Sequence, residues 1–354
     1  MKNKFQLLLF VLCTIFPGAV TFANDESVPR IFILHSYEAN HVCGQPQHDG
    51  IIAALKKAGF VTDFGTGKRF ELQVYHMDTK RKNNTPALID EQAHIALGKI
   101  ETFKPDILVT LDDNAFRTVG LKLADSRLSV VFSGINGQPE AYNRQVPFLN
   151  SRKSPGHNIT GVYEKLHIAE AVRIHSRIFP NLDELRILTD RSPTGQAILE
   201  QVKSELEDEP VPCRWQIKVV KDWETYMDEI HAANSDPKVD AIYPVALLLK
   251  DREGNTFTAP EIFKWTTQNS KKPEIAVNYA FTRMGLFGGA TVDFYAMGYQ
   301  AGRMIIRILK GESPGSIAIE DAEKYALTFN LKRASQLGIK IPDEIIQAAD
   351  EVIK

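Results

Sequence analysis

Short apolar runs of strand length alternate with amphipathic stretches of helical length along most of this chain. In the first half, the runs with strand length and apolar content lie at residues 30–34, 71–76, 107–111 and 130–132. The stretches with helical spacing of apolar residues lie at 49–58 and 85–103. This alternation predicts an α/β fold with parallel sheets.

The same plan returns after residue 158, without any repeat of the sequence itself. The second set of expected strands lies at 159–163, 185–189, 215–220, 241–245 and 275–279. The expected helices between them lie at 168–179, 195–207, 223–233 and 260–269, and the tail adds a helix at 295–309 and a strand at 325–330. Residues 137–158 are rich in Pro, Gly and Asn and predict a linker or a long binding loop. Two such units predict two domains, since single cores stop growing at about 250–300 residues.

The N-terminus is typical of an exported protein. Lys2 and Lys4 precede an apolar run at 7–16, and small residues at 21–23 offer a cleavage point before Asn24. We therefore expect residues 1–23 to be a signal peptide. The run is too short to cross a bilayer, which takes about 20 apolar residues. The mature chain should be periplasmic.

Composition excludes some partners and leaves others open. The net charge of −2 argues against a nucleic-acid partner, which would favour a basic face. After processing only Cys43 and Cys213 remain, so either one bridge between domains or, as we favour, two separate thiols is expected. A metal site built from His35, His41, Cys43 and His48 is conceivable, but their spacing fits no compact motif. We predict no metal and no cofactor.

Polar residues follow three of the expected strands, at the edge where parallel sheets bind ligands. They are His35, Ser36 and Tyr37; Asp112, Asp113 and Asn114; and Ser133, Gly134 and Asn136. We predict that these side chains contact a small polar ligand, with Tyr37 stacking on an apolar part of it. The alternatives are a solvated loop, a helix N-cap among residues 112–114, and crossover geometry at Gly134. A catalytic set of His35, Asp112 and Ser133 is also possible, but polar groups at a cleft are commoner in binding.

The second unit offers a complementary site. Asp190, Ser192, Thr194 and Gly195 precede the helix at 195–207, where free N–H groups and hydroxyls would favour a ligand carboxylate. An ordinary capping loop is the alternative. Asn278 and Asp293 complete the predicted ligand-binding residues. The chain has no Gly-x-Ser-x-Gly elbow and no Gly-rich phosphate loop, so we do not expect an enzyme.

Several segments together resemble a known family. They are the segments at 35–37, 77–81, 112–115 and 131–136, the Asn-Ile-Thr-Gly-Val at 158–162, and much of the tail from Val292 to Ile353. The chain resembles the periplasmic solute-binding proteins of ABC importers, which include tryptophan-type binding proteins. Its first domain is similar to the extracytoplasmic sensor modules of signalling proteins.

The resemblance implies the type I periplasmic-binding-protein fold, with two Rossmann-like lobes of parallel sheet joined by a hinge of three crossovers. The first lobe would hold 28–136 and 291–322, and the second 137–290 and 323–354. It also implies a monomer that captures a small organic ligand, amino-acid-like or aromatic, in the interlobe cleft and delivers it to an ABC permease. The alternatives are a ligand-sensing partner of a membrane sensor kinase and, from another class, an exported α/β hydrolase.

Overall fold

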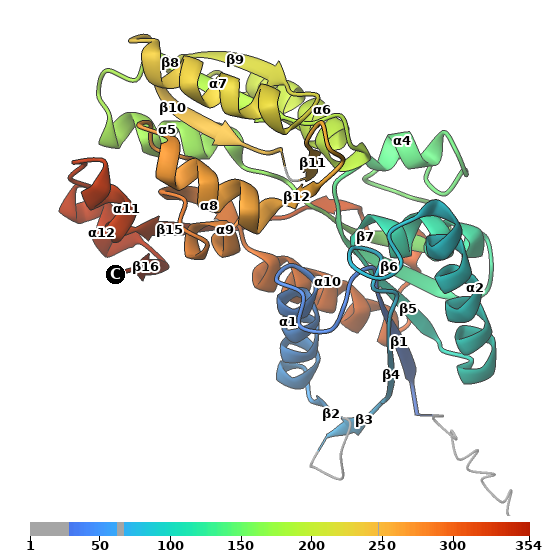
Figure 1. The fold of residues 1–354 in the computed structure, drawn as a ribbon. Coiled ribbons are helices and arrows are strands. Elements are labelled where there is room, and N and C mark those ends of the chain that lie inside the picture. The colour runs from blue at the N-terminus through green and yellow to red at the C-terminus, as the bar shows by residue number, and fades with distance from the viewer. Residues whose placement is uncertain (1–27, 62–66, 247) are drawn as a thin grey trace, which may run out of the picture.

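The structure is a computed structural model that describes residues 28–61, 67–246 and 248–354. The expected signal peptide lies outside these ranges. The described chain forms two lobes, the first with helices packed around one parallel sheet and the second with helices packed around two small sheets (Figure 1). The predicted α/β architecture is confirmed. In the described ranges, no helix combines the length and the apolar character needed to span a membrane.

A six-stranded parallel sheet forms the centre of the first lobe, in the order β14-β7-β6-β5-β1-β4. Its strands are β1 (Arg30–His35), β4 (Glu71–His76), β5 (Ile107–Leu111), β6 (Ser129–Ile135), β7 (Ile159–Tyr163) and β14 (Glu320–Asp321). Its helices are α1 (Gly44–Lys57), α2 (Pro86–Phe103), α3 (Asp112–Ala115), α4 (Pro139–Asn143) and α10 (Phe294–Leu309). The minor elements are the β2 (Phe60–Val61) and β3 (Lys68–Arg69) pair, a π-helical turn at Phe116–Gly120, and 3-10 turns at Leu121–Leu123 and Pro314–Ser316.

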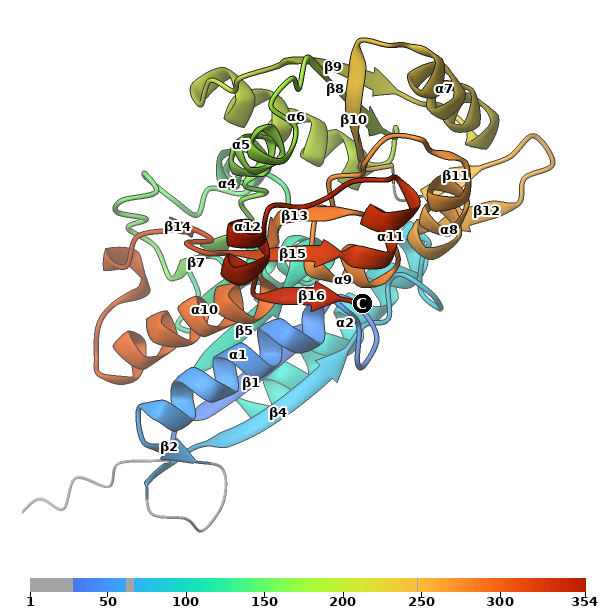
Figure 2. The same cartoon turned by 90° about the vertical axis from the view of Figure 1, so that its left-hand side faces the viewer.

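The central strands of this sheet are buried on both faces. In β1, Ile31 and Ile33 face the side covered by α1 and α10, whereas Phe32 and Leu34 face the side covered by α2 (Figure 2). Burial on both faces explains why these strands appear in the sequence as continuous apolar runs rather than alternating ones.

Helix α1 crosses α10 at very close range, and it begins earlier than the sequence predicts. A Cβ added at Gly298 would lie 2.0 Å from the carbonyl oxygen of Gln47, and one added at Gly50 would lie 2.2 Å from that of Tyr295. Only glycine permits this approach of two backbones. The helix starts at Gly44, five residues before the position predicted from the sequence, so its first turns reach the carboxyl edge of the sheet.

The second lobe contains two small sheets linked by single bridges. The parallel sheet has the order β10-β8-β9, and the other has the order β13-β15-β16, with β13 antiparallel to β15. Bridges at Glu274, Ile275 and Asn278 join them, where the sequence predicts a continuous strand at 275–279.

The remaining bounds of the second lobe are as follows. Its strands are β8 (Glu184–Thr189), β9 (Arg214–Val219), β10 (Val239–Pro244), β13 (Gly288–Val292), β15 (Tyr325–Asn330), β16 (Glu351–Ile353) and the hairpin β11 (Leu248–Lys250) and β12 (Thr256–Thr258). Its helices are α5 (Ile168–Ile178), α6 (Pro193–Asp208), α7 (Trp223–Ser235), α8 (Ala259–Asn269), α9 (Tyr279–Arg283), α11 (Leu331–Gln336) and α12 (Asp343–Ala348).

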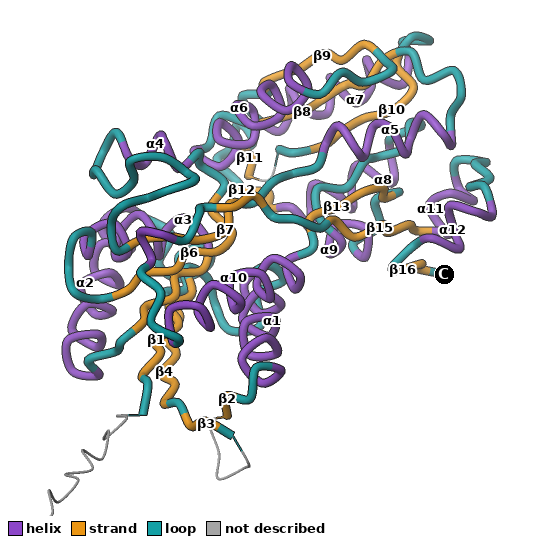
Figure 3. Tube along the Cα trace, turned by 180° about the vertical axis from the view of Figure 1, so that it is seen from behind, coloured by secondary structure: helices purple, strands orange, loops and turns teal. Residues whose placement is uncertain are grey.

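The chain passes between the lobes three times, and the first passage differs from the prediction. Strand β7 pairs with β6 in the first sheet, so the predicted start of the second lobe at residue 137 is wrong. The apolar run at 159–163 closes the first lobe through a non-local pairing, and the crossover follows at 164–167. The other passages lie at Asp293, between β13 and α10, and at 322–324, between β14 and β15. Figure 3 shows both lobes and these connections from behind.

Candidate ligand-binding site

The carboxyl ends of four neighbouring strands meet at one edge of the first sheet. The register places His35 of β1 opposite Leu111 of β5, and Leu111 opposite Ser133 of β6. The backbone N–H of Glu164, directly after β7, donates to the carbonyl of Ile135 in β6. The side chains that follow these strands therefore lie together, as the sequence predicts for an open parallel sheet.

Ser36 and Asn114 connect the strand ends at this edge through hydrogen bonds. The Ser36 hydroxyl donates to the Leu111 carbonyl at 2.7 Å and accepts from the Ala115 N–H at 2.8 Å. The Asn114 amide donates to the Thr79 hydroxyl, which itself donates to the Ser36 carbonyl. Both predicted residues thus hold neighbouring strand ends in place through polar groups that are already engaged.

His35 is buried in a stack of histidines. Its Nε2 lies 3.1 Å from His48 Nδ1, and its ring centroid lies 4.2 Å from that of His76. Burial, followed by the proximity of His76, lowers the pKa of His35 to about 2, so the ring is neutral. The Ser133 hydroxyl has no hydrogen-bond partner among the described residues, so no serine–histidine pair forms here. Within those same residues, no three His, Cys, Asp or Glu side chains are arranged to hold a metal ion.

Asp113 organises the loop that follows β6. Its carboxylate accepts from the backbone N–H groups of Asn136 at 3.2 Å and Gly137 at 3.3 Å, and from the Tyr142 hydroxyl. The side chain of Asn136 donates to Asp113 and to Glu164. Asp113 is therefore occupied, and it does not serve as the helix N-cap that the sequence left open. Helix α3 begins at Asp112, with no side-chain cap.

Asp112, Gln47 and Ser133 leave three buried oxygens without partners. The Gln47 amide donates to Asp112 Oδ1 at 3.1 Å, and a Cβ added at Gly134 would lie 2.7 Å from Gln47 Oε1. Asp112 is 2% exposed, and Gln47 and Ser133 are 0% exposed. In the described structure, Asp112 Oδ2, Gln47 Oε1 and Ser133 Oγ make no hydrogen bond. We call these three side chains the acceptor cluster. Each of these three oxygens can accept a hydrogen bond, so a donor that reached the acceptor cluster would find partners there.

The ionisable groups around the acceptor cluster are mainly carboxyl groups. Glu164 is 4% exposed, and burial, then Asp112 and Asp113, raise its pKa well above the ordinary range. Burial and the neighbouring Asp113 raise the pKa of Asp112 to about 7, against the opposing effect of Lys80. The Lys80 ammonium lies 4.6 Å from the centre of the Tyr37 ring. Burial, Asp112 and Asp113 likewise raise the pKa of Tyr37, so it is a neutral phenol beside the carboxylates.

Residues of the second lobe close over this edge. A hollow of about 390 Å³ is lined by Asn40, His41, Val42, Gln45 and Pro46 of the first lobe and by Tyr279, Ala280, Arg283 and Met284 of the second. Burial and then Cys43 of the first lobe raise the pKa of Tyr279, which lines this hollow from the second lobe. Cys43 and Cys213 are both free thiols.

The loop at 190–195 differs from the open anion site that the sequence predicts. Asp190 Oδ1 accepts from the Ser192 N–H at 2.8 Å, and its Oδ2 accepts from the Leu248 N–H. The Ser192 hydroxyl accepts from the Gly195 N–H as the N-cap of α6. The chain's own carboxylate thus occupies this helix start, and Thr194 is exposed. The capping alternative describes the loop better.

Asn278 and Asp293 are also caps. The Asn278 side chain accepts from the Phe281 N–H at the start of α9, and Asp293 accepts from the Ala296 N–H at the start of α10. Both lie where the lobes approach each other, but their side-chain oxygens fix helix starts. Their effect on a ligand would be through the position of those helices.

Comparison with known protein families identifies the family to which this chain belongs. The family described as ABC transporter substrate binding protein matches residues 46–353. The chain belongs to this family. Substrate-binding proteins of the family act outside the cytoplasm.

Individual relatives of this substrate-binding protein are distant. A tyrosine-binding protein of Clostridioides difficile (strain R20291) is 24% identical over 185 residues, which cover 51% of this chain and 50% of that protein. The chain thus spans about half the length of that curated relative.

Solved structures show that the fold is shared over nearly the whole chain. An ABC domain from Streptococcus pneumoniae in complex with L-Trp has a TM-score of 0.67 at 20% identity, covering 92% of this chain and 100% of that one. A ligand-free, open substrate-binding protein with adhesive properties from Clostridium difficile has a TM-score of 0.68 at 16% identity, with the same coverage. Both likenesses confirm the type I periplasmic-binding-protein fold.

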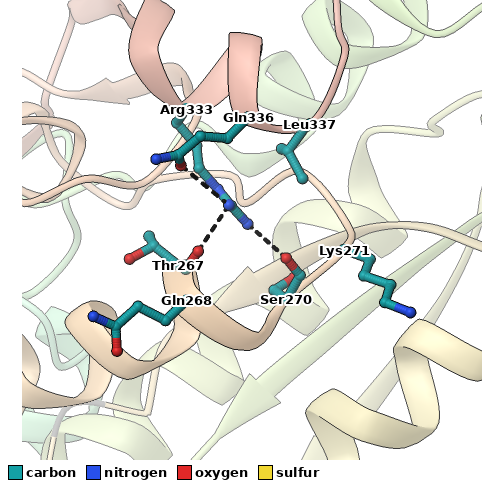
Figure 4. A pocket seen from close by; sticks show the side chains of 7 residues that line it. All are labelled: Thr267, Gln268, Ser270, Lys271, Arg333, Gln336 and Leu337. Carbon is teal, nitrogen blue, oxygen red and sulfur yellow. Dashed lines mark hydrogen bonds between the residues drawn. The ribbon is translucent and has the colours of Figure 1, made fainter.

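A second hollow of this substrate-binding protein lies away from the strand ends. It measures about 490 Å³ and is lined by second-lobe residues of α8, the loop at 270–271, α11 and Leu337, which follows α11 (Figure 4). Its central group, Arg333, is fully engaged. It forms a buried ion pair with Glu274 and donates to the carbonyls of Thr267 and Ser270. The hollow therefore offers a ligand no free charged group from Arg333.

Sequence reasoning missed Gln47, Glu164, Lys80 and Tyr279. Glu164 directly follows β7. Had that strand been placed in the first sheet, the rule that ligand groups follow the carboxyl ends of parallel strands would have identified Glu164 as it identified Asp112. Gln47 lies in helical turns that the sequence prediction left out. Lys80 lies in the segment at 77–81, and Tyr279 ends the strand predicted at 275–279, but sequence reasoning assigned neither residue a role in binding. No local signal marks either as facing the cleft.

Proposed function

We propose that this protein captures a small organic solute with a protonated amino group in its interlobe cleft and delivers it to the membrane component of an ABC importer. The observation that carries this proposal is the acceptor cluster. It presents three unpartnered oxygens, one of them from a carboxylate, at the carboxyl edge of a parallel sheet.

An ammonium group matches this arrangement in number and charge. It has three N–H donors and no acceptor, and each oxygen of the acceptor cluster can accept a hydrogen bond. Leaving a polar group buried without a hydrogen bond costs roughly 1–3 kcal/mol, so a ligand that supplies the donors gains from each contact. The tyrosine-binding relative and the L-Trp complex support amino-bearing aromatic solutes as the first ligands to test.

The neighbouring groups would hold the rest of the solute. Tyr37 and Tyr279 present rings from opposite lobes, and the hollow between the lobes is lined by Val42, Pro46 and Met284 as well as polar groups. A solute bound to both lobes would hold them together, which is how hinge closure signals occupancy to a membrane partner. The protein would act as a monomer, since each copy carries both halves of the site.

The ligand can be identified without assuming its structure. The protein would be purified without washing out bound solute and then denatured, and the released small molecules identified by mass spectrometry. We expect a solute with a basic nitrogen. Asp112→Asn should retain at least tenfold less of it, because a hydrogen bond to a charged group contributes about 1.5–3 kcal/mol. Asp90→Asn, at an exposed position on α2, is the matched control and should retain the parent amount.

Closure can then be measured with the identified solute. Small-angle scattering should show a smaller radius of gyration on saturation. A released solute without a basic nitrogen, or equal retention by Asp112→Asn and the parent, would contradict the proposed site.

A further inference from the structure

Lys80 is an exposed cation beside the strand ends of the first lobe. Its ammonium group lies 4.6 Å from the centre of the Tyr37 ring. Among the described residues, Lys80 forms no ion pair with an aspartate or a glutamate. The attraction between a lysine and an aromatic ring is weak at an exposed site. The ammonium group therefore keeps hydrogen-bond donors available for an anion.

Two other cations near the cleft are already engaged. Arg81, the residue after Lys80, has its guanidinium 3.5 Å from the Glu38 carboxylate. Arg283, which lines the hollow from the second lobe, pairs with Glu351 at 2.8 Å. The protein's own carboxylates thus balance these two arginines, and Lys80 differs from both because its nearest recorded partner is a neutral ring.

Hydrogen bonds of Thr79 fix the backbone that carries Lys80 against the strand ends. The Thr79 hydroxyl donates to the Ser36 carbonyl at 2.7 Å and accepts from the Asn114 amide at 2.9 Å. The Thr79 N–H also donates to the Ser36 carbonyl, at 3.0 Å. Ser36 follows β1 and Asn114 follows β5, so Lys80 extends from the same edge of the sheet that carries the acceptor cluster.

An anionic group on the solute would need a cation at this edge. In an α-amino acid the ammonium and carboxylate groups are bonded to the same carbon atom, so a solute held at the acceptor cluster brings both to the strand ends. The carboxyl groups of Asp112, Asp113 and Glu164 lie there, and any that is ionised repels a further anion. The loop at 190–195 uses an N–H group for a carboxylate of its own. Lys80 remains as the cation that can offset this repulsion.

We propose that Lys80 is a specificity-determining residue that receives an anionic group bonded next to the amino group of the solute. The role of Lys80 rests on the proposed function, because the acceptor cluster fixes where the amino group lies. On binding, the Lys80 ammonium leaves the face of the Tyr37 ring and pairs with the anion, which frees that face for an apolar part of the solute. A simple amine brings a second positive charge toward Lys80 and no anion, so the site rejects it.

Two matched pairs of compounds test this role, tyrosine with tyramine and tryptophan with tryptamine. In each pair the amine lacks only the carboxylate. Calorimetric titration of the parent should show the amino acid binding about tenfold more tightly than its amine, or better. Lys80→Gln should weaken the amino acid roughly tenfold, because a hydrogen-bonded charge pair is lost. The amine should bind Lys80→Gln as tightly as the parent or more tightly, since a like charge is removed.

Two further variants separate this role from a structural one. Lys80→Arg should keep the preference for the amino acid. Lys82→Gln, at an exposed position two residues along, is the matched control and should bind all four compounds as the parent does. A purely structural role of Lys80 would weaken both members of a pair equally. Urea denaturation of Lys80→Gln should match that of the parent, because the replaced side chain is exposed.

The outcomes that overturn the role of Lys80 are specific. They are equal binding of both members of a pair by the parent, and equal weakening of both in Lys80→Gln. A third is a preference lost in Arg191→Gln but kept in Lys80→Gln, because Arg191, an exposed cation of the loop at 190–195, would then hold the anion.

The solute released from the purified protein decides the case in which none of the four compounds binds. A released solute with an anionic group next to its amino group, retained less by Lys80→Gln than by Lys82→Gln, supports the role of Lys80. A released amine without such a group overturns that role and leaves the proposed function standing. A released solute without a basic nitrogen overturns the proposed function itself.

Discussion

Replacing Asp112 with asparagine should stabilise the empty protein at the same time as it weakens ligand binding. The carboxyl group of Asp112 is 2% exposed, and its pKa is raised from an ordinary value near 3.8 to about 7. Each pKa unit corresponds to about 1.4 kcal/mol, so ionising this group costs the folded protein about 4 kcal/mol more than it costs the unfolded chain.

The sign of the effect depends on pH. Below about pH 4 the carboxyl group is protonated in both states and adds no cost. Between pH 4 and pH 7 the folded protein keeps a proton that the unfolded chain has lost, so stability falls as pH rises. Above pH 7 the full cost is present. Asparagine removes it, and the new amide can donate to Gln47 Oε1.

We therefore expect Asp112→Asn to raise the free energy of unfolding by about 2 to 4 kcal/mol at pH 8 and by much less at pH 4. Urea denaturation of parent and variant at both pH values measures this difference. Asp113→Asn, one residue along, should have the opposite sign. Its carboxylate accepts from two backbone N–H groups, and hydrogen bonds to charged groups contribute about 1.5–3 kcal/mol. If Asp112→Asn is no more stable than the parent at pH 8, or gains as much stability at pH 4 as at pH 8, the inferred cost of ionising buried Asp112 is refuted.

Three further predictions concern other parts of the chain. Gly134→Ala should lower both stability and affinity, because Gly134 has φ of +77° and a Cβ would collide with Gln47; unchanged denaturation and titration curves would speak against that packing. Arg333→Met should reduce the free energy of unfolding by about 3–5 kcal/mol, because it leaves Glu274 buried without its ion pair. If that is the cause, adding Glu274→Leu to the variant should restore the free energy of unfolding. The intact mass of exported protein should correspond to a chain beginning at Asn24; a mass that includes residues 1–23 would contradict the expected cleavage.

The strand ends could be predicted well from the sequence because strands buried on both faces are continuous apolar runs that stop at the first polar residue. The run at 107–111 is apolar throughout and stops at Asp112, so both the strand and the candidate ligand group could be identified from it. The pairing of β7 could not be predicted in the same way. Its apolar run shows that it is a strand but not which sheet it joins, because its partner is fixed by tertiary contacts.

The candidate site shows a similar limit. Asp112 and Asp113 have the same chemistry and adjacent positions, yet one carboxylate is engaged by the loop after β6 and the other is not. The loop at 190–195 carries signals that suit both a cap and an anion site, and the Leu248 N–H that occupies Asp190 lies far along the chain. Which polar atoms remain unpartnered is a property of the assembled fold.

The close crossing of α1 and α10 also has a consequence for the order in which this protein can form. Residues 44–57 and 294–309 lie near opposite ends of the chain, yet they make one layer of the first lobe. A ribosome or an export channel releases the N-terminal partner long before the C-terminal one. Helix α1 therefore has no α10 to pack against until most of the second lobe has been synthesised. Such distant pairing slows folding, because a long loop must close before the contact is gained. The first lobe therefore completes this helical layer only after residues 294–309 become available.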